Sequence, residues 1–194
     1  MRFDKEANLW DEKPRRVALA KKVVEKIETY CNNKTILDFG CGTGLVSLNL
    51  KNAKRILGVD LSSEMIKIFN QKVEMLQLPA KGVVSDIKHI DNKFDIIVAN
   101  MVFHHIEKID KMLQILSTKL TKNGKLFISD LFLEDGSFHD KGNEDVFHFG
   151  FEKNSFSHTN FELKSYSHIF TIEKERKNQI KKYKVYLWEL ENRV

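Results

Sequence analysis

Residues 37 to 44, LDFGCGTG, place an acid ahead of three glycines at alternate positions. Glycines at 40, 42 and 44 let the backbone adopt positive φ angles and approach a bound molecule closely. A tight turn from a strand into a helix needs only a single glycine. Three glycines therefore predict a loop that holds a cofactor at the carboxyl end of a strand, where ligands bind in open α/β sheets.

Two cofactor classes compete for such a loop. The dinucleotide fingerprint Gly-x-Gly-x-x-Gly, counted from Gly40, requires a glycine at position 45, where the sequence has Leu45. Asp60 ends the apolar run RILGVD at a distance that suits the ribose of either class, so it does not discriminate between them. Asp38 and the alternate glycine spacing disfavour a dinucleotide, and with it a hydride-transfer enzyme.

Four histidines are candidates for acid–base chemistry, because histidine titrates near neutrality. His104 and His105 follow the apolar run FDIIVANMV, whereas His139 and His148 lie among phenylalanines further along. Adjacent residues point in different directions, so we expect at most one of His104 and His105 to face a pocket. A phenylalanine-rich loop with histidines suits a lid over a small acceptor, or a loop folded onto its own aromatic side chains.

The elements that position these residues follow from an alternation of apolar and amphipathic segments. Runs that are apolar throughout predict buried parallel strands, with helices on both faces of the sheet. The predicted fold class is α/β, a Rossmann-like doubly wound sheet. Strands are expected at TILDFG, RILGVD, GVVSD, FDIIVANMV and KLFISDLF, and helices from Arg15, from Leu45 to Leu50, after Ser62 or Ser63, and from Glu107 to Leu120.

The two ends of the chain depart from this alternation. We expect an N-terminal cap-helix region over residues 1–30, a lid or insert loop over 132–160, and a C-terminal strand pair over 161–190. The stretch EKERKN, between the two strands of the pair, is interpreted as a solvated turn. No repeat or linker divides the chain, so residues 1–194 are expected to form one domain.

Composition and charge restrict the functional classes. The net charge of +5 divides into +3 over residues 1–34, −1 over 35–170 and +3 over 171–194, so no basic patch predicts a nucleic-acid partner. No apolar run reaches the roughly 20 residues of a membrane span, and the N-terminus lacks a signal-peptide pattern, so we expect a cytoplasmic protein. Cys31 and Cys41 show no CxxC or His/Cys spacing, so neither a disulfide framework nor a metal site is expected.

Four segments, taken in order, resemble the motifs of class I S-adenosylmethionine-dependent methyltransferases of the small stand-alone kind. ILDFGCGTG is similar to the first motif, ILGVDLSSEMI to the second, VVSDI to the third and FDIIVANMVFHHI to the fourth. The resemblance implies a seven-stranded, mostly parallel sheet of order 3-2-1-4-5-7-6 with the last strand antiparallel. It also implies S-adenosylmethionine as the methyl donor and S-adenosylhomocysteine as its product.

The same resemblance implies roles for single residues. Asp38 would face the ammonium group of the donor, and Asp60 would accept hydrogen bonds from both ribose hydroxyls. Asp86 would accept from the adenine amino group, because an exocyclic amine needs an acceptor. The cofactor-binding residues implied are Asp38, Gly40, Cys41, Gly42, Gly44, Asp60, Leu61, Asp86, Ile87 and Asn100. Phe3 and Trp10 are candidates for covering the cofactor, and His104, His105, His139 and His148 for catalysis.

The acceptor is expected to be a small molecule with an oxygen, nitrogen or sulfur nucleophile. Pro14 and Pro79 are the only prolines, so the Asn/Asp-Pro-Pro-aromatic motif of DNA adenine methyltransferases and the Pro-Cys nucleophile of cytosine-5 enzymes are both absent. EKNSFSHTNF is short for the helix that the family usually has before its sixth strand. The expected assembly is a monomer or homodimer. The alternative is a protein that binds S-adenosylmethionine or S-adenosylhomocysteine without transferring a methyl group.

Overall fold

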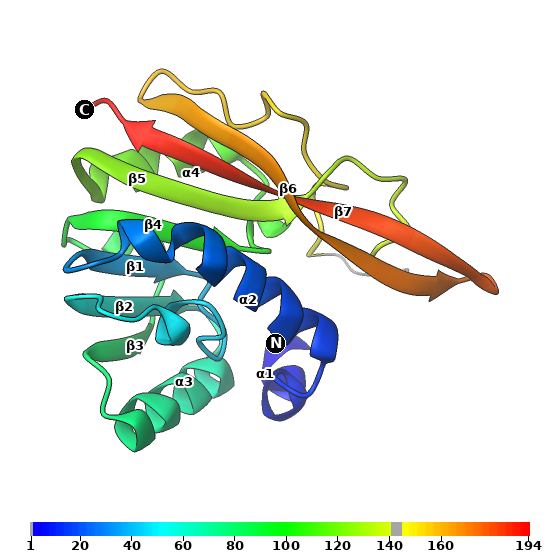
Figure 1. Ribbon diagram of the computed structural model, residues 1–194, viewed down its shortest axis with the longest axis horizontal. Coiled ribbons are helices and arrows are strands. Elements are labelled where there is room, and N and C mark those ends of the chain that lie inside the picture. Colours follow the sequence, from blue (N-terminus) through cyan, green and yellow to red (C-terminus); the bar gives the residue numbers. More distant parts are fainter. Residues whose placement is uncertain (1, 141–144) are drawn as a thin grey trace.

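A seven-stranded sheet of order β3-β2-β1-β4-β5-β7-β6 runs through the protein (Figure 1). The computed structural model describes residues 2–140 and 145–194. Strands β1 to β5 are parallel, and β7 is antiparallel to both β5 and β6. The predicted fold class and strand order are therefore confirmed. The strands are β1 (Thr35–Phe39), β2 (Arg55–Asp60), β3 (Ala80–Val84), β4 (Phe94–Asn100), β5 (Leu120–Leu131), β6 (Phe161–Arg176) and β7 (Gln179–Asn192).

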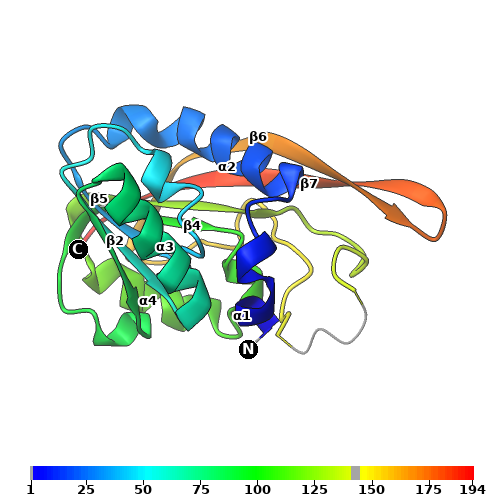
Figure 2. The same ribbon diagram turned by 90° about the horizontal axis from the view of Figure 1, so that it is seen from below.

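Helices cover both faces of this sheet, and Figure 2 shows α2 and α4 on opposite sides of it. The helices are α1 (Arg2–Glu6), α2 (Pro14–Ile27), α3 (Ser63–Leu76) and α4 (Ile109–Thr118), and short 3-10 turns occur at Ala7–Leu9, Glu28–Tyr30, Ser47–Asn49, Ile87–His89 and Phe103–His105. Successive strand residues point to opposite faces. Ile36 accordingly packs with α2 and α3, whereas its neighbour Leu37 packs with α4.

The helix predicted from Leu45 to Leu50 does not form, and this prediction was wrong. Only a 3-10 turn, Ser47–Asn49, follows the glycines. The chain has to return at once to the start of β2, and it reverses at Asn52, whose φ is 61°. Val46, Leu48 and Leu50 still enter the core, so their apolar spacing reflects burial rather than helix. The glycine loop consequently has no helix dipole behind it.

The C-terminal hairpin of β6 and β7 extends well beyond the rest of the sheet (Figure 1). Lys177 and Asn178 form an exposed turn, as predicted for EKERKN, but the other two basic residues of that stretch are not solvated. Arg176 donates hydrogen bonds from Nε to the carbonyl of Ser137 and from Nη2 to that of Phe138, both at 2.6 Å. Lys174 also donates to the Phe138 carbonyl, and burial lowers the pKa of this lysine to about 8. The hairpin therefore holds the segment that carries His139.

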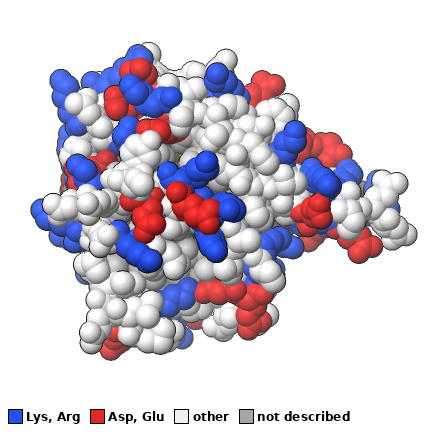
Figure 3. Space-filling view, viewed as in Figure 1, with Lys and Arg blue, Asp and Glu red and all other residues white. Residues whose placement is uncertain are grey.

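Residues 132–140 and 145–160 contain no helix or strand, apart from an isolated bridge between Phe132 and Phe151. Residues 141–144 of the predicted lid lie outside the described residues. None of the helices in the described part of the chain is long and apolar enough to cross a membrane. On the face shown in Figure 3, acidic and basic side chains are interspersed, and neither sign forms a continuous field.

Candidate active site

The glycine loop connects β1 to the 3-10 turn Ser47–Asn49. The backbone N–H groups of its glycines and of Cys41 already donate hydrogen bonds to other groups of the protein. Gly40 and Cys41 both donate to the carbonyl of Val59, at 2.8 and 3.1 Å. Gly42 donates to Oδ2 of Asp60 at 2.9 Å, and Gly44 donates to the carbonyl of Cys41 at 2.9 Å. A loop that binds pyrophosphate instead directs its N–H groups toward the ligand. This loop is therefore poorly suited to a phosphate group.

Gly40 and Gly44 are required at their positions for steric reasons. Their φ angles are +70° and +84°, where other L residues are strained. A Cβ on Gly40 would lie 2.5 Å from Cγ2 of Val102, and a Cβ on Gly44 would lie 2.6 Å from the side chain of Leu48. The two glycines thus allow the loop to pack tightly against its neighbours.

This geometry predicts unequal effects of two alanine substitutions. Gly40→Ala is expected to lower the free energy of unfolding by about 2–3 kcal/mol, through the clash with Val102 and the strained φ. Gly42→Ala should cost about 1 kcal/mol, because the nearest atom to its Cβ would be 3.7 Å away. Urea denaturation of both variants measures the difference. Equal losses of stability would show that Val102 leaves room for a Cβ at position 40.

Asp38 and Asp60 form a negatively charged pair at the carboxyl ends of β1 and β2. Asp38 is only 2% exposed. Burial, together with the nearby charge of Asp60, raises its pKa to about 7, against the lowering effect of hydrogen bonding to Ser47. Burial also raises the pKa of Asp60, against the lowering effect of hydrogen bonds from the backbone N–H groups of Ser62 and Gly42. Within residues 2–140 and 145–194, no lysine, arginine or histidine forms an ion pair with either carboxylate.

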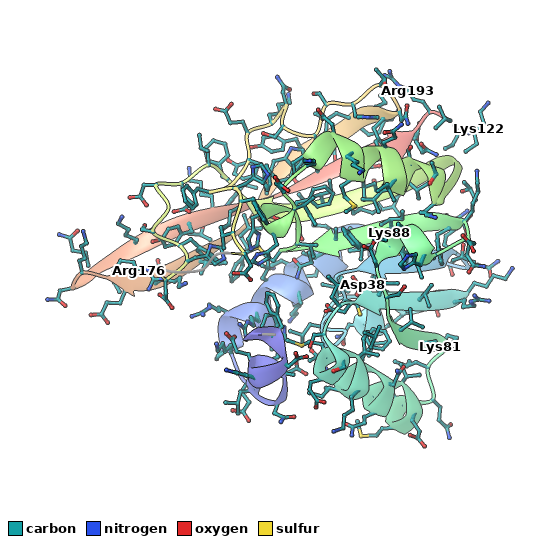
Figure 4. The ribbon with its side chains drawn as sticks, turned by 180° about the vertical axis from the view of Figure 1, so that it is seen from behind. Asp38, Lys81, Lys88, Lys122, Arg176 and Arg193 are labelled. Carbon is teal, nitrogen blue, oxygen red and sulfur yellow. The ribbon has the colours of Figure 1, made fainter. Side chains whose placement is uncertain are left out.

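Such a pair favours a ligand that brings positive charge. A buried carboxylate without a cationic partner is costly, and a cation close to it lowers that cost. Figure 4 shows Asp38 in the middle of the molecule; of the labelled lysines in the same part of the view, Lys88 pairs with Asp86, and no ion pair joins Lys81 to Asp38 in the described residues. The ligand itself is therefore the natural source of the compensating charge.

The other predicted cofactor residues lie along the same edge of the sheet, in different environments. Leu61 follows β2 and is 60% exposed, so its side chain is available to an aromatic ring. Cys41 is buried, which raises the pKa of its thiol well above the usual range. The Asn100 side chain accepts a hydrogen bond from Oγ of Ser129 at 2.6 Å, which fixes the end of β4 against β5.

Asp86 and Ile87 follow β3. The Asp86 carboxylate accepts from the backbone N–H of Lys88 at 3.0 Å, and Lys88 Nζ lies 3.1 Å from it. These contacts cap the 3-10 turn Ile87–His89, as a purely structural acid would. Ile87 is buried in the core, so its backbone is the part that remains for a ligand.

The N-terminal segment is attached to both ligand loops. Oγ of Ser62 donates to Asp4 at 2.6 Å, beside Asp60. Oγ1 of Thr43, in the glycine loop, donates to Asp11 at 2.6 Å. Lys72 of α3 donates to Asp11 and, at 2.9 Å, to the carbonyl of Thr43. These bonds hold the segment over the ends of β1 and β2.

The two aromatic candidates of this segment lie over the site. The ring of Phe3 meets that of His105 edge-on, with 5.6 Å between centroids. Nε1 of Trp10 would be 3.7 Å from a Cβ on Gly42, and the guanidinium of Arg16 stacks on the Trp10 ring at 3.3 Å. Figure 2 shows α1 running close to the segment that follows β5.

The contact between Asp11 and Thr43 predicts a role for the N-terminal segment in ligand retention. Asp11→Ala is expected to weaken binding of the cofactor about tenfold, mainly through faster dissociation, because a charge-assisted hydrogen bond contributes about 1.5–3 kcal/mol. Stopped-flow displacement measures the rate. The neighbouring exposed residue gives a matched control, Glu12→Ala, which should leave the rate unchanged. Equal rates in wild type and Asp11→Ala would contradict a covering role.

Three of the four candidate histidines come together. One ring nitrogen from each of His104, His105 and His139 lies within 4.8 Å of those of the other two. His148 is separate, because its Nε2 donates to the carbonyl of Ile106 at 2.9 Å. The rings of His104 and His105 do not point in different directions, as expected of adjacent strand residues: their centroids are 4.1 Å apart, because both residues lie in a 3-10 turn.

Hydrogen bonds orient the first two rings. Nδ1 of His104 lies 2.8 Å from Oδ1 of Asp130, a fully buried carboxylate that also accepts from the backbone N–H of His104 and of Leu131. Nδ1 of His105 donates to the carbonyl of Asp145 at 2.6 Å. Burial and the neighbouring His104 lower the pKa of His105. Asp130 was not foreseen from the sequence, although an acid inside the apolar run FISDLF is an available signal.

Comparisons with known proteins agree with this geometry. Residues 37–128 match the family model described as methyltransferase domain. An uncharacterized methyltransferase of Schizosaccharomyces pombe is 33% identical over 117 residues, 54% of this chain and 41% of the relative. The ubiquinone biosynthesis O-methyltransferase of Pelagibacter ubique is 31% identical over 102 residues, 51% of this chain and 42% of the relative. The matched region thus spans about two fifths of these relatives.

Among solved structures, an S-adenosylmethionine-dependent methyltransferase from Clostridium acetobutylicum ATCC 824 superposes over 100% of both chains, with a TM-score of 0.68 and 17% identity. This likeness shows the fold. The match to the family model covers the segment that contains the glycine loop, Asp60, and His104 and His105 after β4. Residues 37–128 of this chain are therefore similar to a methyltransferase domain, and the chain has the fold of an S-adenosylmethionine-dependent methyltransferase of known structure, as its motifs predict.

Proposed function

We propose that this protein transfers a methyl group from S-adenosylmethionine to a small-molecule acceptor. The observation that carries the proposal is the buried pair Asp38 and Asp60, which has no cationic partner in the described residues, beside a loop whose N–H groups are already used. S-adenosylmethionine brings a sulfonium, an ammonium and a vicinal diol. Its charges and hydroxyls complement two carboxylates, whereas a pyrophosphate would be repelled by them.

Different residues bind different parts of the cofactor. Asp38 pairs with the ammonium group, and the Asp60 carboxylate, already oriented by two backbone N–H donors, accepts from the ribose hydroxyls. Leu61 packs on the adenine. The wall and remaining contacts come from Gly40, Cys41, Gly42, Gly44, the carboxylate of Asp86 and the backbones of Ile87 and Asn100.

Catalysis requires alignment of the acceptor, exclusion of water and removal of a proton. The bound donor supplies a methyl group that is already activated on sulfur. The N-terminal segment and the segment around His139 cover the site and exclude water. A histidine of the cluster takes the proton of a neutral acceptor as it is methylated. Asp130 fixes the ring orientation of His104 for this purpose.

A small acceptor is supported by what surrounds the histidines. His104 is buried, and His105 lies beneath the ring of Phe3, so a bulky macromolecule has little access to either. On the face shown in Figure 3 the charges are mixed, so that face offers no continuous basic surface to a nucleic acid. One relative, a ubiquinone biosynthesis O-methyltransferase, supports the same class of acceptor.

The acceptor class is tested by following a labelled methyl group. Purified protein is incubated with methyl-labelled S-adenosylmethionine and a cell extract divided by size into metabolites, proteins and nucleic acids. We expect label in the metabolite fraction, and none with an Asp60→Ala variant. Label confined to protein or nucleic acid would overturn the small-molecule acceptor. Donor binding without label in any fraction would favour a binding protein that does not transfer the methyl group.

A further inference from the structure

We propose that His104, His105 and His139 bind one divalent transition-metal cation, with zinc as the best-suited metal. The three rings come from the turn after β4 and from the segment after β5, and one nitrogen of each lies within 4.8 Å of the others. Three imidazoles with a fourth position left open form a recognised type of catalytic zinc site. Metal binding is a property of the folded chain and stands independently of the proposed methyl transfer.

The spacing is close to what coordination requires. Zinc–nitrogen bonds of about 2.0–2.1 Å in a tetrahedral site place two ligand nitrogens about 3.4 Å apart. The separations of up to 4.8 Å therefore need to contract by at most about 1.4 Å. The His104 and His105 rings are already adjacent at 4.1 Å between centroids, and His139 lies 4.9 Å from His104. A small movement of the His139 segment completes the site.

His104 and His105 also make the hydrogen bonds that are typical of metal-binding histidines. A ligating histidine usually presents its other ring nitrogen to a carboxylate or a backbone carbonyl, which fixes the ring and its tautomer. Nδ1 of His104 contacts the buried carboxylate of Asp130, and Nδ1 of His105 donates to the carbonyl of Asp145. Nε2 of both rings is therefore the metal-binding atom. The Asp130 charge also offsets part of the charge of a buried cation.

The His139 segment is anchored at its other side. The Phe138 ring packs edge-on against His139 at 4.8 Å between centroids and against Tyr183 at 5.1 Å. Arg176 and Lys174 hold the Phe138 carbonyl. The segment is thus fixed next to the cluster by the long β6–β7 hairpin, which gives that extension of the sheet a positioning role.

A metal at this point would act on the acceptor, and this consequence rests on the proposed function. The open fourth position suits a hydroxyl or thiol acceptor, R–XH. Because metal-bound rings cannot accept a proton, the cation then replaces the histidine base: the acceptor's proton leaves to solvent as X binds the metal, a new X–CH3 bond forms, the CH3–S bond breaks, and its electron pair remains on sulfur. The substrate class is therefore an alcohol, phenol or thiol rather than an amine, because such acceptors need deprotonation before attack.

Metal binding is tested on the full chain without methyl donor. Metal-free protein is titrated with zinc chloride by calorimetry, and with Co²⁺, whose visible absorption reports tetrahedral coordination. We expect one equivalent to bind with a Kd of about 1 µM or tighter. His105→Ala and His139→Ala should each weaken metal binding by more than 100-fold. A loss of 10–100-fold is typical when the replaced residue only hydrogen-bonds to a metal ligand. The exposed His168, bonded to Thr171 on β6, gives the control His168→Ala, which should bind like wild type.

The outcomes separate this inference from the proposed function. Absence of stoichiometric binding, or equal binding by His139→Ala, His105→Ala and wild type, would overturn the metal site. Circular dichroism and S-adenosylhomocysteine binding on the same samples show whether a variant remains folded. Metal binding without methyl transfer to any fraction would leave the site standing and remove the proposed function. Methyl transfer that is unaffected by metal removal would overturn the metal's role in acceptor activation.

Discussion

Replacing Asp38 with asparagine is expected to weaken binding of S-adenosylmethionine about 100-fold and to stabilise the unliganded protein at pH 8. The loss of affinity follows because the donor's ammonium loses its charged partner, and breaking a buried ion pair costs roughly 3 kcal/mol or more. The gain in stability follows because Asp38 is buried without a cationic partner among the described residues. Calorimetry and urea denaturation measure the two effects.

The pH dependence of the stability gain has a definite sign. The pKa of Asp38 in the folded protein, about 7, lies above its ordinary value of 3.8, so the folded state favours the protonated acid. Wild type therefore loses stability as the pH rises from about 4 to 7, and the loss is constant above that. At ~1.4 kcal/mol for each pKa unit, the gain from Asp38→Asn is at most about 4 kcal/mol at pH 8 and small at pH 4.

Asp91, an exposed carboxylate ahead of β4, supplies the control. Asp91→Asn should change neither the affinity for S-adenosylmethionine nor the stability at either pH. An Asp38→Asn variant that binds the donor as tightly as wild type would remove the ammonium contact from the account. An Asp38→Asn variant that is less stable than wild type at pH 8 would show that hydrogen bonding to Ser47 outweighs the cost of burying the charge.

Asp60→Ala is expected to lower the affinity for S-adenosylhomocysteine by 100-fold or more. Its carboxylate would accept two hydrogen bonds from the ribose, and such charge-assisted bonds contribute about 1.5–3 kcal/mol each. The same substitution leaves the backbone N–H groups of Gly42 and Ser62 without their acceptor, so the free energy of unfolding should fall by about 1–3 kcal/mol. Calorimetry and urea denaturation report both quantities.

Asp86 provides the comparison for this prediction. Its side chain is more exposed, accepts from a single backbone N–H and is screened by water, so Asp86→Ala should cost tenfold in affinity at most. Titration with adenosine alone separates the ribose contact from the amino-acid end of the ligand. A loss of less than threefold for a folded Asp60→Ala protein would contradict the assignment of the ribose to Asp60.

The sheet was predictable because its strands are buried on both faces. RILGVD and FDIIVANMV carry uninterrupted apolar runs, which only a parallel sheet between two helical layers requires. The absence of a helix after the glycine loop could not be predicted in this way. Val46, Leu48 and Leu50 are buried in a short 3-10 turn, and burial alone gives the apolar spacing that suggests a helix.

The candidate site was predictable where its residues are close in sequence. The glycine loop and Asp60 belong to local motifs, whereas the cluster of His104, His105 and His139 depends on tertiary structure. The bonds from Asp11 to Thr43 and Lys72 join three segments with no shared pattern. Arg176 was interpreted as solvated because charged stretches usually are, yet it binds the carbonyls of the His139 segment.

Turnover of S-adenosylmethionine on a small acceptor is measured by the amount of S-adenosylhomocysteine formed. Purified protein is incubated with excess S-adenosylmethionine and the metabolite fraction of a cell extract, and the product is quantified by mass spectrometry. We expect many equivalents of S-adenosylhomocysteine per protein with wild type, and none above background with Asp60→Ala. Recovery of the donor unchanged, bound one to one, would contradict it.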